Sequence, residues 1–153
     1  MKTSMRLQSG ILGSLLALAL SPLAHAALGG AASTLQADRM QLKAAAPTST
    51  SKLNYTVHEM TLPNGTAVRE YVADEKVFAV AWRGRQMPDL QQLMGTYFDT
   101  YTKEAKAHHG SHHHMAITHA DFVMHAAGQS RLFVGSAYVP AMLPAGVKAA
   151  DIQ

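Results

Sequence analysis

The sequence predicts an α+β fold: an antiparallel sheet of about five strands with one amphipathic helix packed across a face, preceded by a signal peptide and a short N-terminal helical arm. Apolar residues alternate with a period of two over 53–73 and again over 120–139, as in half-buried strands. Over 90–101 they recur at the three-four spacing of one helix face. The 153 residues, 48% of them hydrophobic and 15% charged, have the composition of a folded protein with one core.

Residues 1–26 have the pattern of a cleaved export signal. Lys2 and Arg6 precede an apolar run over 11–20, and residues 24–26 (Ala-His-Ala) present the small-x-small pattern that signal peptidase cleaves. We expect cleavage before Ala27. The alternative is a membrane anchor, but a span needs about 20 apolar residues and this run reaches roughly 13. We therefore expect Sec-type export to the periplasm or the cell exterior, with no transmembrane anchor after cleavage.

Charge and cysteine content exclude several classes of function. The chain has 13 Lys plus Arg against 10 Asp plus Glu, and loss of Lys2 and Arg6 leaves 11 against 10, a net charge of about +1. A nucleic-acid partner is therefore not expected. Because the chain contains no Cys, it can form neither a lipidated N-terminus nor a disulfide. The exported protein should be non-lipidated.

The mature chain divides into two parts. Residues 27–51 form an N-terminal arm together with a linker. Ser33 or Thr34 could cap a helix running to about Lys43, and the linker over 44–51 is rich in Pro, Ser and Thr. Residues 52–153 form a single α+β domain with a His-rich loop over 108–119.

The domain begins with three predicted strands. Asn64-Gly65 joins the strand that starts near Leu53 to a return strand over 66–73, because both turn residues tolerate a positive φ. Residues 77–82 (VFAVAW) have no polar side chain on either face. This segment should therefore be the central strand, covered on at least one side by apolar residues.

A helix and a second hairpin complete the domain. Met87-Pro88-Asp89 suits a helix start, and the apolar face over 90–101 should lie across the sheet. Two strands follow, over 120–125 and 131–139, and the tail over 143–152 looks irregular and could pack back onto the domain. The strand order is not determined by the sequence.

Several segments of the mature chain resemble the family of small exported bacterial proteins known as domain of unknown function 2844 (DUF2844). They are Ala27-Leu28-Gly29-Gly30, the Asp38 segment, Asn64-Gly65-Thr66, residues 68–72, residues 77–82, Pro88-Asp89-Leu90 with Leu93 and Tyr97-Phe98, residues 137–140 and residues 143–147. The resemblance covers nearly the whole mature chain. It implies export and a single domain, and it transfers no catalytic residue. The family's segment after the helix is not rich in His, so the cluster here looks like a departure.

The His-rich segment is the one chemical feature of note. Imidazole is a common ligand of Zn, Ni and Cu, and a thioether such as that of Met115 favours Cu(I). The alternative is an exposed polar connection without a metal. An iron site made of His119, Asp121 and His125 is disfavoured, because Asp121 and His125 would lie about 13 Å apart on one extended strand. The candidate metal ligands are His108, His109, His112, His113, His114 and His119.

Other motifs are weaker. Arg83 and Arg85, after the central strand, could hold an anion or could form a solvated turn. Ser111 with a neighbouring His and Asp121 has the components of a nucleophilic triad but sits in a segment without rigid orientation. We expect no catalytic residues and no cofactor.

The sequence thus favours an exported, non-enzymatic accessory or interaction module whose partner is another exported or envelope protein. The alternative is a His-rich periplasmic binder of Zn, Ni or Cu. A small hydrolase is a distant third hypothesis.

Overall fold

A seven-stranded antiparallel sheet forms the centre of the computed structural model, which describes residues 27–107 and 114–153. The spatial order of the strands is β1-β2-β3-β4-β7-β6-β5, and all six pairings are antiparallel. The strands are β1 (Thr48–Ser51), β2 (Thr56–Thr61), β3 (Ala67–Ala73), β4 (Lys76–Gly84), β5 (His114–Thr118), β6 (Val123–Gln129) and β7 (Leu132–Tyr138). The predicted signal peptide and the candidate ligands His108, His109, His112 and His113 lie outside the described residues.

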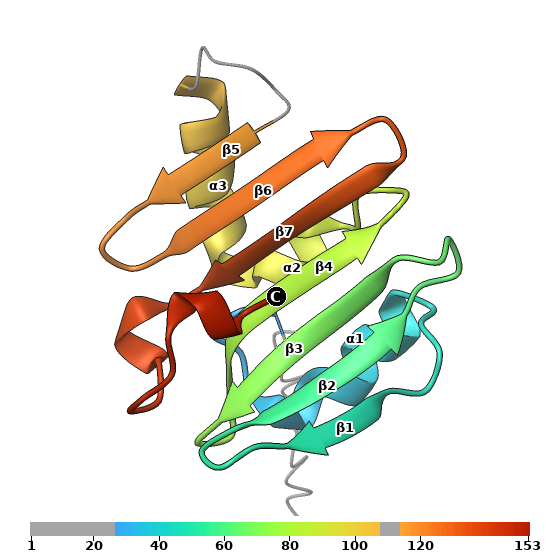
Figure 1. Ribbon diagram of the computed structural model, residues 1–153, viewed down its shortest axis with the longest axis vertical. Helices are drawn as coiled ribbons and strands as arrows, with labels where there is room; N and C mark the ends of the chain where they lie inside the picture. The colour runs from blue at the N-terminus through green and yellow to red at the C-terminus, as the bar shows by residue number, and fades with distance from the viewer. Residues whose placement is uncertain (1–26, 108–113) are drawn as a thin grey trace, which may run out of the picture.

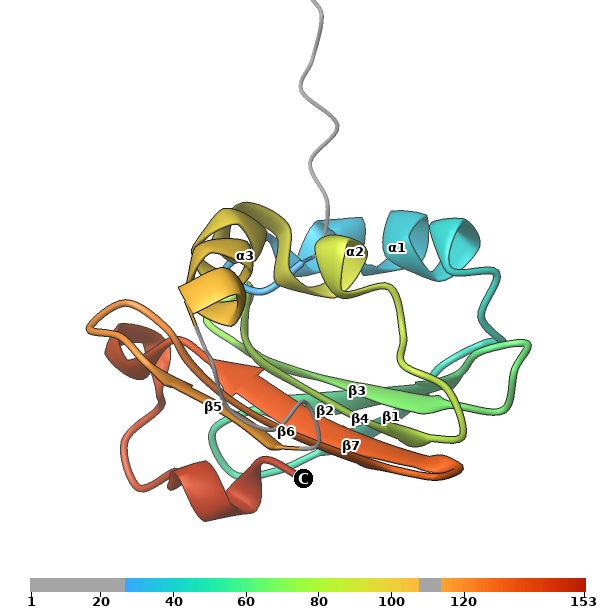
Figure 2. The ribbon, with the colours of Figure 1, turned by 90° about the horizontal axis from the view of Figure 1, so that it is seen from above.

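Helices cover one face of this sheet, and the C-terminal segment lies against the other (Figures 1 and 2). The helices are α1 (Leu35–Gln41), α2 (Leu90–Met94) and α3 (Phe98–Ala107), with short 3-10 turns η1 (Ala32–Thr34), η2 (Gly95–Tyr97), η3 (Pro140–Met142) and η4 (Ala149–Asp151). The predicted α+β class is therefore confirmed, with more strands than expected. None of the helices in the described ranges is long and apolar enough to cross a membrane.

The expectation of about five strands missed both edges of the sheet. β1 forms from the predicted linker, where all four residues are exposed, so no apolar alternation marks it as a strand. β5 forms from the end of the predicted His-rich loop: Met115 and Ile117 point toward the helices, but the preceding run of His obscures their alternation. Edge strands bond to one neighbour only, so backbone pairing can hold them with little apolar signal.

The prediction of a central strand is confirmed by β4, which has three strands on each side. Val77 and Val80 are fully buried beneath the helices, whereas Phe78, Ala79 and Ala81 are buried on the opposite face by the C-terminal segment. Phe78 and Ala79 face the same way because the register of β4 against β3 shifts by one residue at this point.

The predicted long helix is interrupted at Gly95. Its expected apolar face does pack on the sheet, but the helix divides into α2, η2 and α3. Gly95 has a φ of 50°, and a Cβ placed there would lie 2.5 Å from the Cβ of Ala27. The helix therefore breaks where the N-terminal segment passes against it.

This N-terminal segment connects the helix layer to the sheet. The Leu28 amide donates to the Leu93 carbonyl of α2 at 2.9 Å, and the Gly29 amide donates to the Val77 carbonyl of β4 at 2.8 Å. Ala27 and Leu28 are 3% and 1% exposed. The arm is thus an integral part of the fold, and α1 follows close to where a helix was predicted.

Trp82 fills the helix side of the sheet at the end of β4, where its ring lies against the backbone of Gly135 on β7. Any Cβ at residue 135 would overlap the indole. Gly135→Ala should therefore destabilise the protein by about 1–3 kcal/mol, because the ring must shift within a filled core. Thermal unfolding measures this, with Ser136→Ala as the control on the open face of the same strand. Equal melting temperatures for the wild type and Gly135→Ala would contradict the packing described here.

Candidate functional site

The face of the sheet opposite the helices is only partly covered. The C-terminal segment crosses its middle, in front of β4 in Figure 1, and packs Ile152 against Tyr71 and Phe78. The same segment lies on the side away from the helices in Figure 2. Because the segment is narrower than the sheet, a groove remains on each side of it.

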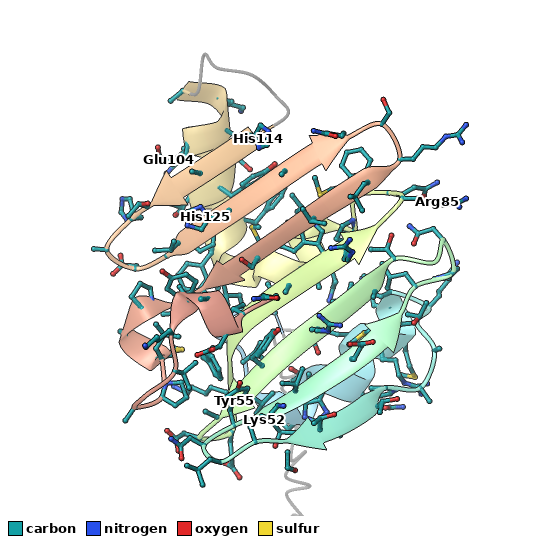
Figure 3. All side chains as sticks on the ribbon, viewed as in Figure 1. Lys52, Tyr55, Arg85, Glu104, His114 and His125 are labelled. Atoms are coloured by element: carbon teal, nitrogen blue, oxygen red, sulfur yellow. The ribbon has the colours of Figure 1, made fainter. Side chains whose placement is uncertain are left out.

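The first groove, which we call the polar groove, lies over β1, β2 and β3 and has a volume of about 660 Å³. Side-chain alternation along the strands brings its residues to one face, and the register sets Thr48, Glu59 and Arg69 in one row. The polar and aromatic side chains that line it include Thr50, Lys52, Tyr55, Glu59, Arg69 and Asp151. Figure 3 shows Lys52 and Tyr55 at one end of this part of the sheet.

Hydrogen bonds fix the floor of the polar groove. Arg69 Nε donates to Glu59 Oε2 at 2.5 Å, and this bond is the main reason that the pKa of Arg69 is raised. Arg69 Nη1 and Tyr71 Oη both donate to the main-chain oxygen of Gln153, at 2.7 and 2.8 Å. Burial raises the pKa of Tyr71, so its hydroxyl stays protonated. The C-terminal segment and the groove floor therefore hold each other in place.

The second groove, which we call the apolar groove, lies over β5, β6 and β7 and has a volume of about 610 Å³. His114 and His125 line it, and both are labelled in Figure 3. His114 pairs with Ala127 and Ala116 pairs with His125, so the two imidazoles occupy diagonal positions on one face of neighbouring strands. Such positions lie about 7–8 Å apart between Cα atoms.

The structure separates the candidate metal ligands that it describes. His114 begins β5 and His119 follows its end, which places them about 16 Å apart along an extended strand. His119 lines a different depression together with Asp121. Within residues 27–107 and 114–153, no three His, Asp or Glu side chains form a group suited to a metal ion. His125, which was not among the predicted ligands, is the His that shares a groove with His114.

Arg83 and Arg85 do not share a groove either. Arg83 of β4 pairs with Ala67 of β3 and with Val134 of β7, and it lines the apolar groove. Arg85 lies beyond the end of β4, is not among the residues lining that groove, and points away from the sheet in Figure 3. Of the two arginines predicted to hold an anion together, only Arg83 therefore lines the groove.

A buried acidic pair lies on the helix side of the sheet and was missed by the sequence reasoning. Asp38 of α1 is 2% exposed and accepts a hydrogen bond from Gln92 Nε2 at 2.6 Å. Glu70 of β3 is fully buried, and its two carboxylate oxygens have no hydrogen-bond partner among the described residues. Burial, with a smaller contribution from Asp38, raises the pKa of Glu70 to about 8. The signal was present, since alternation puts Glu70 on the same face as Val68 and Val72.

Ser49, His58 and Glu70 stand in one row across β1, β2 and β3. Ser49 Oγ lies 2.9 Å from His58 Nδ1, and burial lowers the pKa of His58. The order resembles a serine, histidine and acid triad, but Glu70 does not hydrogen-bond the imidazole. The row therefore lacks the contact that orients the base in such triads. The triad considered from the sequence included Ser111, which lies outside the described residues.

Comparison with known proteins places the chain in a family without an assigned function. The family model "Protein of unknown function (DUF2844)" matches residues 24–152. The chain belongs to this family. The match spans the whole sheet, all three helices and every residue that lines the two grooves of this DUF2844 protein except Gln153. No curated protein and no solved structure matches it.

The pKa of Glu70 predicts how the stability of this DUF2844 protein depends on pH. Because the folded pKa of about 8 exceeds the ordinary value of 4.5, the folded state holds a proton that the unfolded state releases across this window. Stability from this group is complete below pH 4.5 and is lost as the pH rises to 8, at about 1.4 kcal/mol per pH unit. Glu70→Gln should remove this loss.

Urea unfolding of the wild type and Glu70→Gln at several pH values between 4.5 and 8 measures the effect. The difference between the two proteins cancels contributions from other groups, including His58. The variant should gain stability relative to the wild type as the pH rises. Parallel curves for the two proteins would show that Glu70 is ionised in the folded state.

Proposed function

We propose that this protein is an exported, non-enzymatic binding module and that the polar groove is its binding surface. The groove itself is the observation that carries the proposal. Its polar residues Thr48, Thr50, Glu59, Arg69 and Tyr71 project from three paired strands, so the sheet sets their positions. Lys52 and Tyr55 come from the connection between β1 and β2, and Asp151 comes from the C-terminal segment. Binding surfaces of this kind need little reorganisation when a ligand arrives.

The start of the fold supports the export step. The predicted cleavage site lies directly before Ala27, and the described structure enters the core at Ala27 and Leu28. A cut at this point would remove the basic and apolar leader and leave the buried segment intact. The ligand of the exported protein would then be a component of the envelope or of the cell exterior.

Export and binding can be tested together. Expressed with its leader in a bacterial host, the chain should be recovered in the periplasm or medium with Ala27 as its first residue. The mature protein should also be retained on isolated envelope material, and the double variant Thr50→Val, Tyr55→Leu should lose this retention. Thr61→Val is the matched control, because Thr61 is an exposed residue of β2 that does not line the groove.

Recovery of an uncleaved chain in the cytoplasm would overturn the export part of the proposal. Equal retention of the wild type and the double variant, with unchanged melting temperatures, would overturn the assignment of the groove.

Binding of Zn, Ni or Cu is the second candidate function, favoured by the positions of His114 and His125. Their diagonal placement allows two imidazoles to approach one ion from neighbouring strands, since neutral imidazole nitrogen is a ligand for all three metals. Both side chains are exposed on the open face. An ion held in this way would have further positions for water or for a partner's ligands.

This second function predicts that His125 matters as much as His114. Calorimetric titration of the mature protein with Cu(II), Ni(II) or Zn(II) should show that His125→Ala weakens binding by at least about tenfold, or 1.4 kcal/mol. His119→Ala should leave the affinity unchanged, because His119 lies at the other end of β5. Wild-type affinity in His125→Ala would exclude the two-strand site.

A further inference from the structure

We infer that the polar groove binds a neutral, hydroxyl-rich glycan. This inference rests on the proposed function and names the ligand class of the same groove. It depends on three properties of the groove: its balance of charge, its mixture of hydrogen-bond donors and acceptors, and its aromatic wall.

The four charged side chains that line the polar groove sum to zero. Lys52 and Arg69 bring two positive groups, and Glu59 and Asp151 bring two negative groups. Glu59 already binds Arg69, so neither sign predominates on the groove floor. An anionic or cationic ligand would gain no net attraction from these four groups and would lose part of its hydration. A ligand without formal charge avoids this cost.

The groove offers donors and acceptors side by side. Lys52 can only donate and Asp151 can only accept, whereas the hydroxyls of Thr48 and Thr50 can do both. A sugar hydroxyl also donates and accepts, and neighbouring hydroxyls on a ring present both capacities at short intervals. A polyol can therefore satisfy this mixed set, which an apolar ligand would leave unpaired.

An aromatic ring stands at one end of the groove. Tyr55 is half-buried, and its ring centroid lies 6.1 Å from that of Tyr71 and 5.8 Å from that of Phe78, edge to face with the latter. These contacts fix the ring without burying it fully. The C–H groups on one face of a pyranose ring pack well against such a ring, since aromatic faces carry partial negative charge.

The size of the groove suits a short oligosaccharide. Its volume of about 660 Å³ lies within the usual range for ligand sites, about 300–1,000 Å³. The groove is open along the β1 edge, where Thr48 and Thr50 are exposed, so a longer chain could extend past it. Because the site is exposed, we expect weak binding to each short segment of the glycan, with a Kd of about 1 mM.

Titration of the mature protein with cellotriose, maltotriose and chitotriose tests the inference, using calorimetry or changes in NMR shifts. At least one of these neutral trisaccharides should bind saturably. Its affinity should change less than about twofold between 0.01 and 1 M salt, where screening lengths fall from about 30 to 3 Å. A strong dependence on salt, or binding only of the anionic control oligogalacturonate, would overturn the inference.

Two variants assign the binding to the groove. Thr50→Val replaces a hydroxyl with a methyl of similar shape and should weaken binding by about twofold to tenfold. Tyr55→Leu removes the ring and should weaken it further, while Tyr55→Phe should retain most of the affinity. Thr61→Val should bind like the wild type. Equal affinity in all four variants would show that the glycan binds elsewhere and would overturn the inference.

The inference and the proposed function fail in different ways. Retention on envelope material that depends on the groove, without binding of any neutral trisaccharide and with loss after protease treatment of the envelope, would overturn the glycan in favour of an envelope protein. Retention that survives protease treatment and is competed by a neutral oligosaccharide would support the glycan. Absence of both retention and trisaccharide binding would overturn both.

Discussion

The fold depends on the burial of β4 from both sides by two different layers. From Val77 to Trp82 every residue of this strand is buried. The helices cover one face of it and the C-terminal segment covers the other. The second layer is the origin of the proposed binding surface, because a narrow segment lying on a wide sheet leaves a groove along each of its sides. Stability and the candidate site therefore come from the same arrangement.

The sequence reveals those elements whose apolar residues are buried. The strand over 77–82 is apolar on both faces, and the face over 90–101 packs on the sheet, so periodicity was sufficient to place each. It was not sufficient for β1, a polar edge strand that contributes no apolar side chain. Nor did it show the break at Gly95, because the cause is Ala27, which is distant in sequence.

The candidate site could not be read from the sequence for a related reason. The polar groove depends on the register of β1 against β2, on that of β2 against β3, and on contacts of Gln153 with Arg69 and Tyr71, which lie more than 80 residues earlier in the chain. The sequence pointed to the His-rich segment as a metal site because its His residues are adjacent in sequence. Pairing of β5 with β6 instead brings His114 beside His125 and leaves His119 at the far end. Sheet register decides which side chains meet.

The burial of Ala27 and Leu28 constrains when an export leader could be removed. A peptidase must hold several residues on each side of the scissile bond in an extended form. In the folded protein, however, the amides of Leu28 and Gly29 are bonded to α2 and β4. Cleavage before Ala27 would therefore have to take place on the translocating chain, ahead of sheet assembly. The order of biogenesis would then be transport, cutting and only afterwards folding, so that a precursor folded in the cytoplasm would be protected from maturation.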